Sequence, residues 1–140
     1  MLTRTDFISQ TYSQPDLFSD FLDDFSPHPI TGDIVRIKNE NSIKQSVKNL
    51  VLTSLGERPF QPFVGSSIYT SLFEPNDFIL ADSIRFNIEN TLTNNEPRVK
   101  LVDVSLLQDP DNNSISVNIV FVILNTQNVQ TLNLILKRVR

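Results

Sequence analysis

The spacing of apolar residues changes once along this chain, and that change decides which folds are open to it. Before Pro97 apolar residues recur every three or four positions, the period of an α-helix, and after Pro97 they alternate, the period of a β-strand. Helices followed by strands that are joined through short turns are typical of α+β folds. We therefore expect an α+β domain in which helices cover one face of an antiparallel sheet.

The helical part of the sequence predicts two main helices with a short helix between them. The first main helix is expected to begin at a cap on Asn39 or Asn41, to run to about residue 54 and to end at Gly56. Its buried stripe consists of Ile43, Val47, Leu50, Val51 and Leu55. This spacing is typical of an amphipathic helix that packs on a core through one face.

The short helix and the second main helix follow a loop that contains two prolines. Ser66 or Ser67 is expected to cap the short helix, which runs through Leu72 and Phe73 and ends at Pro75. A cap on Asp77 then begins a helix that runs from Phe78 to about Asn94. Its buried stripe has residues one turn apart: Ala81, Ile84, Ile88 and Leu92, with Thr91 as the alternative to Leu92.

Three alternating segments after Pro97 predict a C-terminal three-stranded antiparallel meander. Its inward positions are Val102, Val104 and Leu106, then Ile115, Val117, Ile119, Phe121 and Ile123, and finally Leu132, Leu134 and Leu136. Two turns connect the three segments. The first, at residues 109–113, consists of turn-forming Asp, Pro and Asn, and the second, at residues 125–128, contains two Asn. The expected fold is therefore two main helices and a short one packed on this meander.

We interpret residues 1–32 as an extended, acidic and Phe-rich N-terminal arm, and residues 33–140 as the folded domain. Six acidic residues and one basic residue lie in the first 33 positions of a chain whose net charge is −4. Within the arm, the apolar spacing over residues 16–25 favours a short helix. That helix either packs on its own domain or docks on a neighbouring protein. A short strand is expected over residues 34–37.

The composition excludes several classes of site. The 140 residues, 39% of them hydrophobic, suffice for one domain and not for two. There is no Cys and a single His, His28, so thiolate zinc sites, iron–sulfur clusters, thiol nucleophiles and sites with two imidazoles are excluded. The three Gly residues lack the spacing of a phosphate-binding or dinucleotide-binding loop. We expect no metal and no cofactor.

The charge pattern predicts neither a nucleic-acid partner nor a membrane partner. Residues 34–140 hold ten acidic and eleven basic residues, without the basic face that binds phosphates. The basic cluster at 137–140 is expected to keep a terminal strand soluble. The longest apolar run, at 119–124, is far shorter than the roughly 20 residues that span a bilayer. The N-terminus lacks the apolar run of a secretory signal, and we expect a soluble protein made inside the cell.

An enzymatic role would have to rest on carboxylates, and the candidates are Glu57, Glu74, Glu89 and Glu96. A glycosidase needs two acids across a cleft with their pKa values driven apart. The spacing of these residues does not indicate which two would meet. We therefore expect that this protein is not an enzyme.

Two local motifs are unusual. The first, Gly-Glu-Arg-Pro-Phe-Gln-Pro-Phe-Val-Gly-Ser at residues 56–66, cannot be helical and leads to Leu72-Phe73-Glu74. Its two phenylalanines are expected to pin the loop to the core. The second is Glu96-Pro97-Arg98, where Pro97 forces the preceding residue out of helical geometry. By itself this triplet is either a helix stop with two solvated charges or a stiff corner that presents opposite charges.

Together these motifs resemble the baseplate wedge (sheath-initiator) protein family of contractile-tailed bacteriophages and its counterpart in type VI secretion baseplates. The resemblance covers about residues 38–137 and rests on 56–66, on 72–74 and on Asn95-Glu96-Pro97-Arg98 before a strand. It implies a small α+β structural protein with one copy per wedge. Such a protein sits on the inner baseplate and offers a template from which sheath polymerisation starts.

The resemblance also implies which residues bind partners. In the family the Glu-Pro-Arg triplet is associated with contacts to neighbouring baseplate proteins, and here it falls on Glu96, Pro97 and Arg98. We expect further contacts from the loop and the short helix, at Arg58, Phe60, Phe63, Phe73 and Glu74. The implied partners are other wedge proteins and the sheath protein, with tail-tube or hub proteins as further candidates, in a virion baseplate assembled in the host cytoplasm.

Three alternatives stay open at this point. The first alternative is a component of a type VI secretion baseplate. The second is a tail-associated peptidoglycan hydrolase whose activity depends on Glu57 or Glu74. The third is a free-standing adaptor that binds its partners through the Phe-rich arm. The sheet nevertheless favours a templating role, because an open antiparallel meander leaves unpaired N–H and C=O groups along its edge. An extended segment of another chain can pair there.

Overall fold

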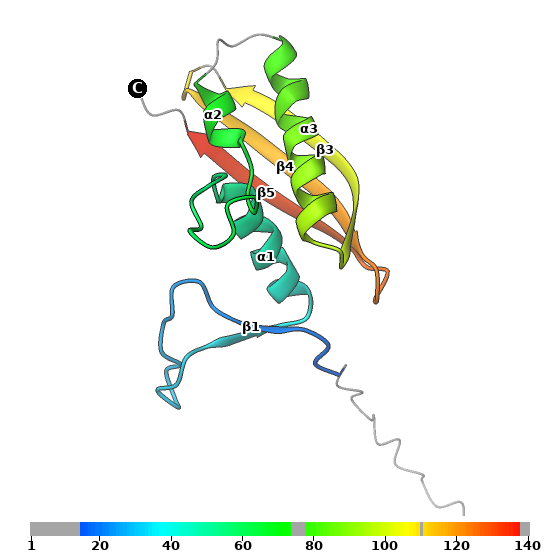
Figure 1. The fold of residues 1–140 in the computed structure, drawn as a ribbon. Helices are drawn as coiled ribbons and strands as arrows, with labels where there is room; N and C mark the ends of the chain where they lie inside the picture. Colours follow the sequence, from blue (N-terminus) through cyan, green and yellow to red (C-terminus); the bar gives the residue numbers. More distant parts are fainter. Residues whose placement is uncertain (1–14, 74–77, 110, 138–140) are drawn as a thin grey trace, which may run out of the picture.

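The computed structural model describes residues 15–73, 78–109 and 111–137, except for the side chain of Phe78. The elements of this part of the chain are, in order, β1 (Ser19–Phe21), β2 (Arg36–Lys38), α1 (Glu40–Leu52), α2 (Ile68–Leu72), α3 (Phe78–Asn95), β3 (Val99–Asp109), β4 (Ser114–Ile123) and β5 (Val129–Lys137). The helices lie on one face of the sheet that β3, β4 and β5 form (Figure 1). The predicted α+β fold is confirmed.

The C-terminal sheet is the expected three-stranded antiparallel meander, with β4 in the middle. Every predicted inward residue of β4 is buried, as are Leu134 and Leu136 of β5. The pairing of β3 with β4 shifts between Leu101 and Asp103. This bulge interrupts the period of two, so Val102, which was expected to point inward, is exposed.

The core lies between this sheet and the two main helices. Ile43, Val47 and Val51 of α1 are fully buried, and α3 contributes Ile84 and Ile88. Because these side chains recur at one-turn spacing, each helix buries one stripe against the sheet. Among the described residues, no helix combines the length and the apolarity needed to cross a membrane.

The end of α1 differs from the prediction. The helix ends at Leu52, and Thr53 is extended, with both its backbone N–H and its hydroxyl donating to the carbonyl oxygen of Asn49. Thr53 thereby satisfies the last turn, and Gly56 lies in the following loop with a φ of 82°. The prediction that Gly56 ends the helix is wrong, and Leu55, placed beyond the helix, is exposed and not part of the stripe.

The predicted caps are only half right. Asn39 and Ser67 occupy the positions before α1 and α2, but neither side chain makes a capping hydrogen bond. The Asn39 side-chain oxygen instead accepts hydrogen bonds from the backbone N–H groups of Leu17 (2.9 Å) and Phe18 (3.4 Å). Asn39 therefore fastens the N-terminal segment to the start of α1. The predicted roles of Pro75 and Asp77 lie outside the described residues.

The helix predicted over residues 16–25 is wrong. This segment contains β1, which pairs antiparallel with β2, and residues 15–38 form what we call the N-terminal hairpin. A single short helix is marginal in water, whereas the hairpin satisfies backbone groups through β2 and packs on α1. Gln45 of α1 donates to the carbonyl oxygen of Phe21 (2.7 Å). The hairpin spans the boundary that we placed after residue 32, and it packs on its own domain.

The proline-containing loop between α1 and α2 is held by its backbone. The N–H of Gly56 donates to the carbonyl oxygen of Pro62 (2.9 Å), and that of Ser66 donates to Thr53 (2.8 Å). Phe60 and Phe63 are 97% and 88% exposed. The expectation that these rings pin the loop to the core is wrong. Hydrogen bonds across the base of the loop hold its conformation instead.

Candidate contact site at the α3–β3 corner

Glu96, Pro97 and Arg98 connect α3 to β3, and we call these three residues the corner. The N–H of Glu96 donates to the carbonyl oxygen of Leu92 (2.9 Å) and closes the last helical turn. Pro97 cannot donate a backbone hydrogen bond and cannot continue the helix. The chain therefore turns at once into β3, and both charged side chains are held on a short, stiff segment.

The carboxylate of Glu96 is buried, with 3% of the residue exposed. Arg98 donates two hydrogen bonds to it, from Nε to Oε1 (2.5 Å) and from Nη2 to Oε2 (2.6 Å). The hydroxyl of Ser46 on α1 donates a third, to Oε2 (2.6 Å). A bidentate guanidinium and a hydroxyl thus occupy the carboxylate. The interpretation of the triplet as two solvated charges is wrong.

The ionisation of both groups follows from this arrangement. Burial on its own would raise the pKa of Glu96, but the hydrogen bonds from Arg98 and Ser46 and the charge of Arg98 bring the pKa below its usual value. The hydrogen bonds to Glu96 raise the pKa of Arg98, against the effect of burial. The corner is therefore an ion pair at neutral pH.

Arg98 also joins the corner to the N-terminal hairpin. Its guanidinium carbon lies 5.3 Å from the centre of the Phe18 ring, within the range of a cation–π contact. The Arg98 side chain remains 37% exposed. One guanidinium thus holds Glu96, contacts the hairpin and still presents part of its surface to solvent.

A hollow of about 420 Å³ opens in front of the corner, between α1, the proline-containing loop and α3. Its lining residues are Ser46, Asn49, Leu50, Arg58, Gln61, Val64, Asn95, Glu96, Pro97 and Arg98. The structure thus brings Arg58 together with the corner. The hollow holds two guanidinium groups and one carboxylate that is already paired, so it fits an acidic or polar group of a partner.

The other predicted partner-binding residues lie away from this hollow. Phe63 lines a separate hollow of about 320 Å³ beside α3, and Phe60 projects into solvent. Phe73, directly after α2, is exposed. Glu74 lies outside the described residues. Whether any of these side chains contacts a partner stays a prediction.

The sequence did not indicate Ser46 or Phe18 as parts of the site. Ser46 is 50 positions from Glu96, and a serine on a helix gives no sign of such a distant contact. Phe18 belongs to the Phe-rich arm, and nothing in the spacing of the sequence links it to Arg98. Among the described residues, no cluster of three or more His, Asp or Glu side chains is placed to bind a metal.

A three-stranded meander with its helices on one face places the chain in the class of small α+β proteins. It is similar to a chain of the anti-feeding prophage baseplate (TM-score 0.62, 20% identity, covering 84% of this chain and 83% of that one). It is also similar to a chain of the postcontracted pyocin R2 baseplate (TM-score 0.52, 19% identity, 81% and 97% covered). A Geobacter sulfurreducens protein proposed to be a tail lysozyme has the same fold (TM-score 0.65, 21% identity, 72% and 92% covered).

The sequence comparisons define the family. The profile of the family described as baseplate wedge protein gp25 matches residues 38–128. Baseplate wedge protein gp25 of Enterobacteria phage T4 is 33% identical over 103 residues, which are 73% of this chain and 78% of that protein. The chain belongs to the baseplate wedge protein gp25 family, a family of structural baseplate proteins.

Proposed function

We propose that this protein is a structural component of the baseplate wedge of a contractile phage tail, where it joins inner baseplate proteins and templates the start of sheath assembly. Family membership supports the baseplate role. The templating role is carried by one observation, the unprotected edge of the C-terminal sheet at β5. In this proposal the protein is located in the tail baseplate of a virion assembled in the host cytoplasm.

The two edges of the sheet differ in their protection. β3 carries Lys100 and Asp103 and is interrupted by a bulge, features that discourage pairing with another strand. β5 has nine residues with a single charge, Lys137 at its end, and has neither Pro nor Gly. Ile135 on β5 is exposed. An edge of this kind favours strand addition, so β5 is where an extended sheath segment pairs.

The register identifies the groups that an added strand uses. The N–H of Ile123 on β4 donates to Asn128, directly before β5, and the β4–β5 register runs without a shift. Because hydrogen-bonded pairs alternate in an antiparallel ladder, Leu132 and Leu134 bond to β4. The N–H groups of Thr131, Asn133 and Ile135 then point away from β4, have no acceptor among the described residues and can bond to a new strand.

A proline at position 133 tests the templating role. Asn133→Pro removes an outward N–H and leaves the β4–β5 ladder intact, as proline on an edge strand does. We expect the variant to enter baseplates at the normal copy number while the yield of sheathed tails, counted by electron microscopy, falls sharply. Asn133→Ala is the matched control. Normal sheath yield with Asn133→Pro in every baseplate would refute the templating role.

The corner supplies the second contact, to a baseplate neighbour. Since Glu96 is buried and occupied, the groups that face a neighbour are the exposed part of Arg98, Pro97 and Arg58. Phe60 and Phe63, exposed on the loop that carries Arg58, are further candidate contact residues outside the hollow.

Arg58→Ala tests this contact without touching the buried ion pair. We expect less of the variant to be incorporated into baseplates, measured by quantitative mass spectrometry of purified particles. Arg85→Ala, an exposed arginine on α3, is the control. In intact particles the chain should be present at about one copy per wedge, far below the sheath protein. Equal incorporation of both variants would argue against Arg58 as a contact residue.

A peptidoglycan hydrolase is the rival function, because one protein of the same fold is described in such terms. A glycosidase needs a general acid whose pKa is raised, whereas the pKa of buried Glu96 is lowered. The carboxylate of Glu57 accepts a hydrogen bond from the N–H of Ser54 (2.8 Å). We expect no cleavage of purified peptidoglycan by this chain; cleavage abolished by Glu57→Gln would establish the rival.

The remaining alternative is a type VI secretion baseplate. The curated relative is a phage protein, and we favour the phage tail for that reason. Neighbouring tail genes around this gene would support the phage tail, whereas neighbouring secretion genes would support the alternative.

A further inference from the structure

We propose that a groove between the N-terminal hairpin, α1 and β5 receives an apolar side chain of the strand that adds to β5 and places Lys44 against an acidic residue of that strand. This inference rests on the proposed addition of a strand at β5. The groove has a volume of about 340 Å³ and is lined by Leu22, Asp23, Asp24, Lys44, Gln45, Lys48 and Leu132. None of these residues belongs to the corner or to the loop beside it.

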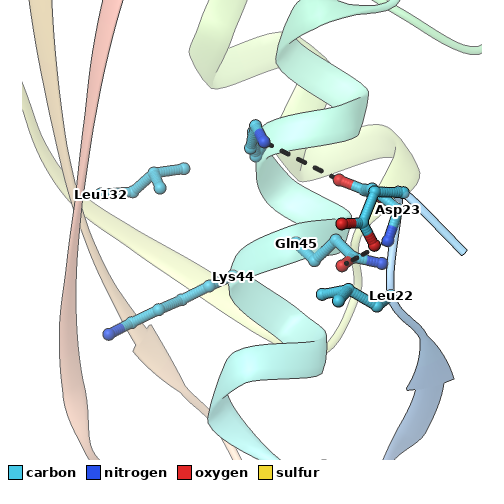
Figure 2. Close-up of a pocket in the computed structure, with 7 residues that line it drawn as sticks. Leu22, Asp23, Lys44, Gln45 and Leu132 are labelled. Carbon is cyan, nitrogen blue, oxygen red and sulfur yellow. Dashed lines mark hydrogen bonds and ion pairs between the residues drawn. The ribbon is translucent and has the colours of Figure 1, made fainter. Parts of the chain in front are cut away.

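The groove has an apolar side chain on each side, and its hairpin wall is fixed. Figure 2 shows Leu132 of β5 and Leu22 of the hairpin on either side of α1. The wall is held because Asp23 accepts a hydrogen bond from Asn49 (2.8 Å), and its own N–H donates to Gln45 (3.3 Å). The groove is therefore a feature of the folded hairpin and not of a free arm.

The charges at the rim are unequal. Lys48 pairs with Asp23, at 3.8 Å between Nζ and Oδ2. Lys44 extends from α1 toward the side on which β5 lies (Figure 2), and makes no ion pair with any described residue. Lys44 is thus a cation beside β5 that has no ion pair with a described residue. Glu40, one turn earlier on α1, is held by the side chains of Asn128 and Gln130. An acidic group is the complement that Lys44 favours.

The sheet geometry directs a side chain into this groove. A strand added to β5 would lie about 4.8 Å from it. Its residue opposite Leu132 would point to the same face of the sheet as Leu132, the face that the helices cover. Further along β5 that face is closed, because Leu134 and Leu136 are buried. Leu132 is half-buried, and the groove is where the inner row of β5 remains open.

The occupant is therefore an extended segment of a neighbouring tail protein with two properties. It has an apolar residue opposite Leu132, and it has Asp or Glu close enough along the strand to reach Lys44. An acid on the hairpin side would meet Asp23 and Asp24 and be disfavoured. The groove thus adds a side-chain preference to an edge whose main-chain hydrogen bonds accept any sequence.

Zero-length coupling identifies the occupant directly. A carbodiimide joins a lysine amine to a carboxylate with loss of water, so purified, intact tails treated with it should yield a Lys44 peptide linked to Asp or Glu of a strand-forming segment of another tail protein. Lys100, exposed on β3, serves as the internal control and should not be linked to that segment. A Lys44 peptide that is unlinked, or is linked only within this chain or to a second copy of it, overturns the inference.

Charge reversal provides the functional test. Lys44→Glu should lower the yield of sheathed tails about tenfold, which corresponds to about 1.4 kcal/mol, while Lys100→Glu leaves it unchanged. Both variants should keep the thermal midpoint of the isolated chain and the normal copy number in baseplates. If Asn133→Pro prevents sheath assembly and Lys44→Glu does not, the groove inference fails and the templating role stands. If neither variant has an effect, both fail.

Discussion

Replacing Arg98 by alanine is expected to destabilise the protein, because it leaves a buried carboxylate with one hydrogen-bond donor. In the native corner Glu96 is 3% exposed and accepts two hydrogen bonds from Arg98 and one from Ser46. Without Arg98 the charge of Glu96 stays in the same place and only the hydroxyl of Ser46 remains. The penalty therefore comes from an uncompensated buried charge and not from the loss of a surface contact.

The size of the effect follows from how much of the pair water can reach. Removing one partner of a fully buried ion pair costs about 3–5 kcal/mol. The Arg98 side chain is 37% exposed, so solvent enters the space it leaves, and we reduce the estimate to about 2 kcal/mol. The lost contact with Phe18 adds about 0.5 kcal/mol.

The penalty should depend on pH in a defined direction. In the native protein the pKa of Glu96 lies below its usual value of 4.5, so the ionised form contributes stability above pH 4.5 that is lost as the pH falls through the lower, folded-state value. In Arg98→Ala burial dominates and raises that pKa, so protonation relieves the variant as the pH falls through the raised value. The stability difference between the two proteins should be widest at neutral pH and narrow in acid.

Urea unfolding of both chains at pH 7 and at about pH 4.5 measures this difference. The double variant Glu96→Gln with Arg98→Ala is the control, because it removes the charge and should be more stable at pH 7 than Arg98→Ala alone. A difference below about 0.5 kcal/mol at pH 7, or one that does not change with pH, would refute the account of a buried carboxylate held by Arg98.

Three further perturbations test other parts of the structure. Gly65→Ala should lower the free energy of unfolding by about 2 kcal/mol or more, since φ is 132° and the new Cβ would lie 2.6 Å from a backbone carbonyl oxygen. The control, Gly56→Ala, lies in open space at φ 82° and should lower it by about 1 kcal/mol. Equal effects of the two substitutions would contradict the close approach at Gly65. Asn39→Ala should lower the free energy of unfolding, measured in urea, by about 2 kcal/mol. The substitution removes the acceptor for two N–H groups and places alanine at a φ of 51°, which is unfavourable for it. An unchanged urea midpoint would show that the hairpin does not need the Asn39 side chain. The double variant Phe60→Ser with Phe63→Ser should change the free energy of unfolding by less than about 0.5 kcal/mol, since both rings are exposed. The same variant should be incorporated less into baseplates. Normal incorporation would show that these rings are not contact residues.

The parts of the fold that the sequence predicted are those whose buried face repeats locally. α1 and α3 show one-turn spacing around Val47 and Ile88, and β4 alternates through Phe121, so each element indicates its own inward side. Neighbouring residues are enough for such predictions. The meander could also be predicted from the sequence, because short turns join its consecutive strands.

The failures occur where the backbone is satisfied by residues far away in the sequence. The segment 16–25 has helical spacing, yet β2 and the side chain of Asn39 hold it as a hairpin. The loop around Phe60 was expected to need aromatic anchors, yet the Gly56–Pro62 hydrogen bond closes it. Local propensity is a weak guide wherever a distant partner offers the same hydrogen bonds.

The sequence indicated where α3 meets β3 but not how the side chains at this corner are directed. Pro97 marked the corner correctly, but the carboxylate of Glu96 faces inward because Ser46 on α1 and Arg98 meet there. Residue type and position alone cannot indicate this, since one of the two residues that hold the Glu96 carboxylate, Ser46, is 50 positions away. The groove could not be predicted either, because it forms between the hairpin, α1 and β5, which are far apart in the sequence.

The two proposed contact surfaces share α1, and different residues of the helix line each of them. Successive residues of an α-helix are about 100° apart, so Ser46, which faces the corner, and Lys44, which faces the groove, are separated by about 200° around the axis. Val47 is fully buried in the core between them. Lys44, Gln45 and Lys48 line the groove, whereas Ser46, Asn49 and Leu50 line the hollow at the corner, so one helix of 13 residues borders both proposed surfaces with different side chains. The hairpin contacts Arg98 through Phe18 and Asn49 of α1 through Asp23, so its unfolding would remove a contact from each surface.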